Sequence, residues 1–143
     1  MRRNRTTVRV RWSDADAAGI GYYPRFFDWF VDGTLELLRG WQASYAELFH
    51  GEGLGLPTIE AHCRFLAPVR YDDALEVETV VAEVRSRAFR LEHTLWRGGE
   101  RVAEGYEVRG WQRIDPASPE VVALSPIPAD VAAWLRGEAA SDG

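Results

Sequence analysis

The feature that most constrains the fold is a long amphipathic segment at residues 24–40. Large apolar side chains recur along it at helical spacing, at Phe26, Phe30, Leu37 and Trp41. Pro24 suits the first turn of a helix, where no backbone N–H is needed, and Gly40 is typical of a helix C-terminus. The segment is therefore predicted to form one long helix, whose apolar stripe must be covered by another element.

Five shorter runs alternate apolar and polar residues, which is typical of β-strands with one buried face. One run precedes the helix and four follow it: residues 7–12, 58–65, 75–84, 89–96 and 101–113. Ser44 and Glu47 have capping-box spacing, so a short second helix is predicted to about residue 49. One strand, one long helix and a four-stranded antiparallel meander make an α+β layout.

Size and composition indicate one domain. With 143 residues, 46% of them hydrophobic, the chain can bury one core but not two. We expect a single domain over residues 1–143, with flexible tails at residues 1–5 and 138–143. The net charge of -5 disfavours a nucleic-acid surface, which needs a basic face. Since no apolar run resembles a membrane span or a signal peptide, and one cysteine cannot form an internal disulfide, we expect a cytoplasmic protein with no membrane partner.

Two acids, Asp14 and Asp16, lie in a small-residue loop between the first strand and the long helix. A carboxylate there can activate water or attack a carbonyl, and the unpaired N–H groups of a helix start can hold the oxyanion that develops. Acids in loops also cap turns, and a carboxylate pair can bind Mg²⁺, although no phosphate-cradling motif lies beside this one. From spacing alone these interpretations stay open.

Histidine, cysteine and lysine chemistry finds little support in the sequence. His62 and Cys63 are neighbours in a predicted strand, so they point to opposite faces and cannot serve one metal or one ion pair. His93 alternates with apolar positions and is predicted to be a core histidine. All 17 basic residues are arginine, which excludes Schiff-base and pyridoxal chemistry, and no G-x-S-x-G motif is present. We expect neither a metal ion nor a cofactor.

The stretch DADAAG at residues 14–19, followed by YYP at residues 22–24, resembles the signature of 4-hydroxybenzoyl-CoA thioesterases and related acyl-CoA thioesterases. The likeness extends through PTIEAHCRFLAPVRYDDALEVET and the later strands. It implies the hot-dog fold, in which one curved antiparallel sheet of about five strands wraps around a long central helix.

The resemblance also implies a catalytic centre in the acidic loop. Asp16 would be the nucleophile or general base, and the N–H of Tyr23 would be the chief oxyanion donor, with Gly19 where the backbone approaches the thioester. Tyr23, seven residues after the acid, is similar to the branch that acts on 4-hydroxybenzoyl-CoA. Ala17 and Gly21 depart from the pattern of that branch, which bears on acyl specificity more than on the chemistry.

Five residues are expected to bind substrate. Trp12 and Tyr22 offer flat apolar walls for an aromatic acyl group, and Pro24 begins the helix beside them. By resemblance, Arg85 and Arg87, in the turn between two strands, would hold the nucleotide end of coenzyme A.

These observations predict an acyl-CoA thioesterase for a small acyl group, possibly benzoyl-type, assembled as a homodimer or homotetramer. A hot-dog hydratase or dehydratase acting on acyl-CoA is one alternative. Dehydratases of this fold pair an acid with a histidine, and no histidine lies near Asp16 in the sequence. A non-catalytic acyl-CoA binding module is the other alternative.

Overall fold

A computed structural model describes residues 1–41, 47, 50–51, 53–120 and 123–138. In chain order the elements are β1 (Arg3–Arg9), the 3₁₀ turn η1 (Trp12–Asp14), α1 (Pro24–Arg39), β2 (Leu54–Gly55), β3 (Thr58–Phe65), β4 (Ala74–Val84), β5 (Ala88–Arg97), β6 (Glu100–Gly110), β7 (Gln112–Arg113) and α3 (Ala129–Leu135).

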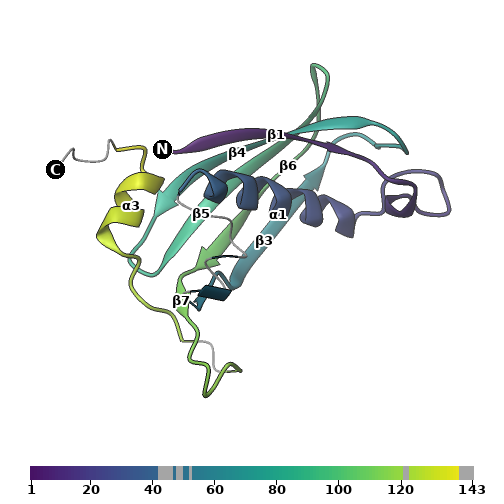
Figure 1. Cartoon of the computed structure of the whole chain (residues 1–143). Helices are drawn as coiled ribbons and strands as arrows, with labels where there is room; N and C mark the ends of the chain where they lie inside the picture. Colours follow the sequence, from purple (N-terminus) through teal and green to yellow (C-terminus); the bar gives the residue numbers. More distant parts are fainter. Residues whose placement is uncertain (42–46, 48–49, 52, 121–122, 139–143) are drawn as a thin grey trace.

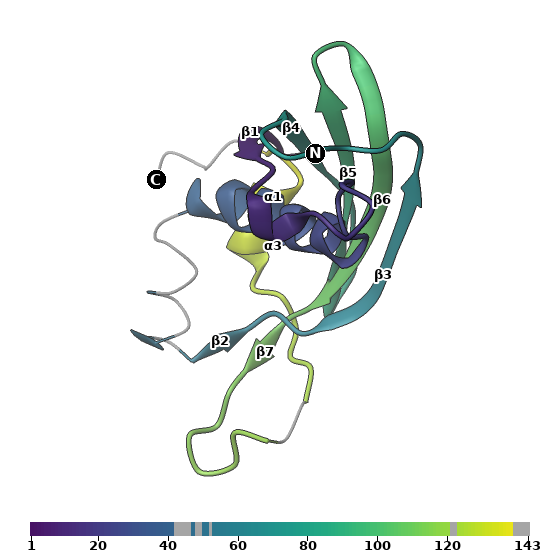
Figure 2. The ribbon, with the colours of Figure 1, turned by 90° about the vertical axis from the view of Figure 1, so that its right-hand side faces the viewer.

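Five of the strands form one antiparallel sheet in the order β1-β4-β5-β6-β3. The sheet curves around α1, which lies along its concave face, and α3 lies at one end of the sheet (Figures 1 and 2). The short strands β2 and β7 pair with each other beside it. The predicted α+β hot-dog fold, with five strands wrapped around one long helix, is confirmed.

The long helix and three of the predicted strands agree with the structure to within one residue at each end. Helix α1 begins at Pro24 and buries the expected apolar stripe, and β3 covers the predicted residues 58–65. The run at residues 101–113 is divided, because β6 ends at Gly110 and the chain then enters β7. Helix α3 was not predicted. The short helix predicted at residues 44–49 lies mostly outside the described residues.

The N-terminal segment corrects two predictions. The first strand is Arg3–Arg9 rather than residues 7–12, since η1 takes up Trp12–Asp14. The prediction of a flexible tail at residues 1–5 is also wrong, because β1 pairs with β4 from Arg3 onward and the Arg2 N–H donates to the Leu135 carbonyl at 2.8 Å. Arg5 also forms ion pairs with two glutamates of β4. The charged residues alone suggested a solvated tail. In the structure, backbone N–H and C=O groups of this segment are hydrogen-bonded to β4 in the sheet.

At the C-terminus, residues 139–143 of the expected tail lie outside the described residues, and the Glu138 N–H donates to the Ala133 carbonyl. In the part of the chain that the structure describes, no helix is both long and apolar enough to cross a bilayer.

Candidate active site

The acidic loop is a tight hairpin. The Asp16 N–H donates to the Ile20 carbonyl at 2.8 Å, and the Gly19 N–H donates to the Asp16 carbonyl at 2.9 Å. Gly19 has a φ of 80°, a left-handed conformation that glycine adopts without steric cost. The Asp16 side chain is exposed, and its Oδ1 accepts the Ala18 N–H at 2.8 Å. Within the described residues, its other oxygen, Oδ2, accepts no hydrogen bond.

This hairpin is anchored to the connection between β3 and β4. The Gly21 N–H donates to the Val69 carbonyl at 2.7 Å, and Ile20 pairs with Arg70 as an isolated antiparallel bridge. A Cβ at Gly21 would lie 2.6 Å from the Val69 side chain, so a larger residue would push the hairpin away. The departure from the family pattern at Gly21 thus has a steric reason in this chain.

Asp14 braces the same loop from inside. Its carboxylate is 1% exposed, and Oδ2 accepts the Arg11 N–H at 2.7 Å. The other oxygen lies 3.6 Å from the Arg25 guanidinium on α1, and the Asp14 carbonyl accepts the Tyr22 N–H. These contacts connect η1, the hairpin and the helix start, and they support a positioning role for Asp14.

An open groove of about 500 Å³ runs between the hairpin, the helix start and the end of β3. It is lined by Asp16, Ile20, Gly21, Tyr23, Phe26, Phe65, Leu66, Ala67 and Pro68. Aromatic rings make one wall, since the Phe65 ring contacts Phe26 at 4.9 Å and Tyr23 at 6.3 Å between centroids. Asp16 is the one ionisable carboxylate of this largely apolar surface.

Tyr23 stands at the N-terminus of α1 with an unused donor. The next residue is Pro24, which has no N–H, and none of the described residues accepts a hydrogen bond from the Tyr23 N–H. Such a donor at a helix start favours negative charge because the helix dipole adds to it. The groove therefore brings together a carboxylate with a free oxygen and a free backbone donor, the two groups that thioester hydrolysis needs.

Several residues predicted for the site do not line this groove. The Gly19 N–H is used within the hairpin, so Gly19 shapes the turn rather than offering a donor. Trp12 is 78% exposed and contacts Tyr71 edge to face, at 5.3 Å between ring centroids. Tyr22 contacts the Tyr23 ring, while Pro24 begins α1; neither lines the groove.

The predicted arginine pair lies far from Asp16 within one chain. Arg85 and Arg87 follow the end of β4, near α3, whereas the Asp16 loop lies at the opposite end of the sheet (Figure 1). An 11-residue strand such as β4 spans roughly 36 Å. Arg85 is paired with Glu83 at 3.1 Å, and Arg87 donates to the Leu124 carbonyl at 2.9 Å.

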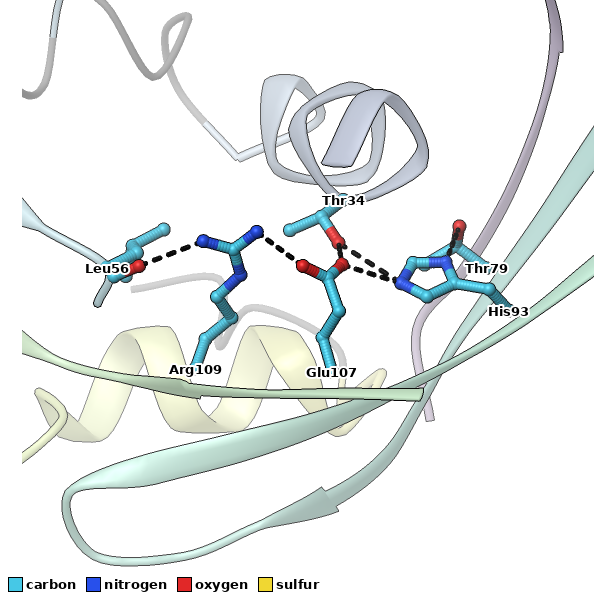
Figure 3. Close-up of polar contacts among 6 residues, drawn as sticks. All are labelled: Thr34, Leu56, Thr79, His93, Glu107 and Arg109. Atoms are coloured by element: carbon cyan, nitrogen blue, oxygen red, sulfur yellow. Dashed lines mark hydrogen bonds and ion pairs between the residues drawn. The ribbon is translucent and has the colours of Figure 1, made fainter. Parts of the chain in front are cut away.

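The sequence analysis missed a buried polar network beneath α1 (Figure 3). Glu107 is 3% exposed and lies 2.8 Å from His93 Nε2, and it also accepts hydrogen bonds from Thr34 and Arg109. Burial alone would raise the pKa of Glu107, but His93, Arg109 and Thr34 together outweigh it, so the pKa is lowered. His93 is buried, as predicted. The available signal was a carboxylate on the inward face of β6, one diagonal position away from the inward histidine of β5, since Glu107 pairs with Leu91 and His93 pairs with Gly105.

The remaining candidates are separated as expected. His62 is exposed and stacks on Tyr106, while Cys63 packs against the core on the other face of β3. Burial raises the pKa of the Cys63 thiol to about 12, so it is a poor nucleophile near neutral pH. In the described ranges of the chain, no three His, Cys, Asp or Glu side chains are arranged to hold a metal ion.

Comparisons with known proteins place most of the chain among similar sequences and structures. A model of the thioesterase-like superfamily matches residues 10–135. The chain is 31% identical over 136 residues to a 1,4-dihydroxy-2-naphthoyl-CoA hydrolase of Thermosynechococcus vestitus, covering 93% of this chain and 90% of that one. Among solved structures, it is similar to a gentisyl-coenzyme A thioesterase, with a TM-score of 0.81, 31% identity, and coverage of 91% of this chain and 98% of the other. The 4-hydroxybenzoyl-CoA thioesterase of Pseudomonas sp. strain CBS-3 also has a TM-score of 0.81, with 25% identity and coverage of 94% and 99%.

Proposed function

Because this chain belongs to the thioesterase-like superfamily and is a thioester hydrolase, we propose that it cleaves small aromatic acyl-CoA thioesters to the free acid and coenzyme A. One observation carries the proposal: Asp16 and Tyr23, whose N–H has no acceptor among the described residues, both line a groove with apolar, aromatic walls.

In the proposed mechanism, the thioester carbonyl oxygen accepts the Tyr23 N–H. The free oxygen of Asp16 then either attacks the carbonyl carbon or removes a proton from an attacking water. As the tetrahedral intermediate forms, its negative oxygen is stabilised by the backbone donor and the helix dipole. The C–S bond breaks and coenzyme A leaves as a thiolate. On the nucleophilic route, water then hydrolyses the acyl–Asp16 anhydride, so both routes release the same acid.

The proposed substrate class rests on two supports. The similar proteins are named for aromatic thioesters, those of 1,4-dihydroxy-2-naphthoic, gentisic and 4-hydroxybenzoic acids. In this chain, the Tyr23, Phe26 and Phe65 rings and the apolar stretch 66–68 line the groove, a surface suited to a flat ring.

We also propose that a second copy completes the site. Strand β3 is a sheet edge, and seven of its eight residues are exposed, including Ile59 at 53% and Phe65 at 48%. A long open edge of this kind favours pairing with another chain. Antiparallel pairing of two β3 strands about a two-fold axis would bring the arginine turn of the second copy toward the Asp16 end of the first. The separation of Arg87 and Asp16 within one chain would then be bridged in a homodimer, which could form half of a homotetramer.

A substrate panel tests the proposed activity. Benzoyl-, 4-hydroxybenzoyl-, phenylacetyl-, butyryl- and crotonyl-CoA are incubated with the enzyme, and free thiol is measured. We expect thiol release, fastest with the benzoyl-type substrates. Binding without thiol release would instead indicate a binding module, and hydration of crotonyl-CoA without thiol release would indicate a hydratase.

Light scattering tests the proposed assembly. At micromolar concentration we expect the mass of a dimer or a tetramer, since the subunit is 16.1 kDa. A monodisperse monomer would contradict the shared site.

A further inference from the structure

One buried polar side chain from each of four elements forms a layer across the core, here called the polar layer: Thr34 of α1, Thr79 of β4, His93 of β5 and Glu107 of β6. Each of these residues is at most 3% exposed. Figure 3 shows them lying in a row between α1 and the sheet, with Arg109 continuing the row toward the Leu56 carbonyl.

The polar layer separates two apolar clusters. On α1, Thr34 lies between Phe30, which belongs to the cluster nearer Asp16, and Leu37, which belongs to the cluster nearer α3. On β4, Thr79 likewise lies between Val77 and Val81, one from each cluster. The same alternation holds on β5, where His93 lies between Leu95 and Leu91. The core is thus apolar at both ends and polar at one level in the middle.

The contacts within the layer are specific. The Thr34 hydroxyl donates to Glu107 Oε1 at 2.7 Å, and the same oxygen lies 2.8 Å from His93 Nε2. His93 Nδ1 lies 2.9 Å from the Thr79 hydroxyl. One turn before Thr34, the Phe30 ring stacks on the His93 ring at 4.7 Å and 11°. Two successive turns of α1 therefore contact the same histidine.

The hydrophobic effect has no direction, so the burial of apolar surface does not by itself specify where α1 lies along the sheet. The close approach of Gly33 to Val77 and Thr79 restricts that position sterically, and the polar contacts add a directional constraint. A slide of one residue moves a helix by about 1.5 Å along its axis and turns its side chains by roughly 100°. Such a slide would carry the Thr34 hydroxyl into an apolar cluster and leave Glu107 without this donor in a buried place, which is costly. A buried polar contact that specifies register is an established use of such groups.

The register of α1 matters because the two reactive groups are held by different parts of the molecule. Asp16 is held by its hairpin, which bonds to Val69 and pairs with Arg70. Tyr22 makes the last hydrogen bond to the loop, through its N–H to the Asp14 carbonyl, and Arg25 of α1 adds an ion pair with Asp14 at 3.6 Å. From Tyr23 onward the chain follows α1, so the place of the Tyr23 N–H depends on where α1 lies.

We propose that the contacts of Thr34 with Glu107 and His93 in the polar layer set the axial register of α1 on the sheet and so position the Tyr23 N–H opposite Asp16. Thr34, Glu107 and His93 are then positioning residues for the hydrolysis, although they do not line the groove. This inference rests on the proposed function for its catalytic consequence, but the register itself is a separate structural property.

The first test compares variants that differ by one hydroxyl. Thr34→Val keeps the shape and removes the donor to Glu107, while Thr34→Ser keeps the donor. The control is Thr79→Val, which removes the hydrogen bond to His93 within the sheet and no hydrogen bond to α1, and which keeps the shape of the side chain beside Gly33 of α1. Kinetics are measured on benzoyl- or 4-hydroxybenzoyl-CoA, whichever the parent turns over, with a melting temperature for each variant.

A misplacement near 1 Å lowers rates by up to about 100-fold, so we expect Thr34→Val to lower kcat by roughly 10- to 100-fold with KM within about twofold. Thr34→Ser and Thr79→Val should keep kcat within about twofold of the parent. If Thr34→Val gives no folded protein, Thr34→Ala carries the same expectation. A kcat that stays at the parent value while the melting temperature falls would overturn the proposal, because the layer would then be structural only.

The second test measures the position of α1 on the sheet directly and does not depend on enzyme activity. In a Cys63→Ser background, spin labels are placed on Asp28 of α1 and Arg101 of β6, which are both exposed, and their separation is measured by electron-electron double resonance. We expect one narrow distance distribution for the parent and Thr34→Ser, and a broadened or shifted one for Thr34→Val. Identical distributions would overturn the register role, whereas an inactive parent with the expected distributions would overturn only the proposed function.

Discussion

Two carboxylates of this protein, Asp16 and Glu107, occupy opposite kinds of surroundings. Asp16 is exposed, lies beside an apolar groove, and accepts one hydrogen bond from its own loop. Glu107 is buried and accepts hydrogen bonds from Thr34 and Arg109, with His93 at 2.8 Å. The first has a free oxygen near an unpaired donor, and the second has its oxygens occupied.

The difference teaches which acid is able to react. Burial and charged neighbours often mark a catalytic group, and Glu107 has both. However, its carboxylate oxygens are occupied by Thr34, His93 and Arg109, and it does not line the groove beside Asp16, so these contacts stabilise the core. Asp16 has few partners, which fits the role proposed for it, since a reacting carboxylate needs an oxygen that substrate or water is able to approach. Each prediction below changes one side of this contrast.

The largest effect is expected for Asp16→Asn. The substitution keeps the size of the side chain and its bond to Ala18 but removes the charge that drives the step. We expect turnover to fall by roughly 10²- to 10⁴-fold at saturating substrate. The melting temperature and the affinity for product coenzyme A should stay near the parent values. Turnover within a few-fold of the parent would contradict the role of Asp16 and make another acid, Asp32 of α1, the next candidate.

Glu107→Gln should act mainly on stability. It removes the charge paired with Arg109 inside the core, and breaking a buried pair costs about 3–5 kcal/mol. Because the pKa of Glu107 is lowered in the folded state, its stabilisation is present above the ordinary value of 4.5 and is lost as the pH falls below it. Urea unfolding at neutral pH and at successively lower pH should show a gap between parent and variant that narrows in acid. If the difference in unfolding free energy between parent and variant did not change with pH, the charge of Glu107 would not be what stabilises the fold.

Asp14→Asn tests whether burial or place in the loop decides the role of an acid. Asp14 is buried like Glu107, but it lies in the same loop as Asp16. Asparagine keeps an acceptor for the Arg11 N–H but loses the charge facing Arg25. We expect a stability loss of about 1–3 kcal/mol and a decrease in turnover much smaller than that of Asp16→Asn. Equal losses of turnover in the two variants would show that Asp14 takes part in the chemistry. Urea unfolding and initial-rate kinetics on the same preparation decide this.

The smallest effect is expected for Arg87→Ala, which extends the contrast to arginine. Arg109 is held inside the core by Glu107, whereas Arg87 is exposed and its guanidinium donates to the Leu124 carbonyl. If Arg87 binds a phosphate of coenzyme A, the variant should raise KM about 2- to 10-fold with little change in kcat. A truncated pantetheine thioester should show a smaller penalty. The same penalty on both substrates would place the role of Arg87 elsewhere.

Features that depend on neighbours in the sequence were predicted well. The helix start at Pro24, the strand Thr58–Phe65 and the loop that carries Asp16 all follow from periodicity, turn residues and a short motif. Features that depend on distant pairing were not. Residues 3–5 looked like a charged tail, and only the ladder with β4 makes them a strand. Trp12 looked like a pocket wall, yet its partner is Tyr71 of a distant turn.

The sequence by itself determined the order of the long helix and the five main strands, the amphipathic character of that helix and the candidate acid, because each depends on chemistry within a few residues. Only the tertiary structure decided that Tyr23 lines the groove with no acceptor for its N–H among the described residues, that Arg87 lies at the far end of the sheet, and that Glu107 meets Thr34 and His93 in the core. These outcomes come from the packing of one helix across five strands. Whether a buried polar residue stabilises or destabilises the fold depends on whether the facing element supplies a hydrogen-bond partner, and only the tertiary structure decides that.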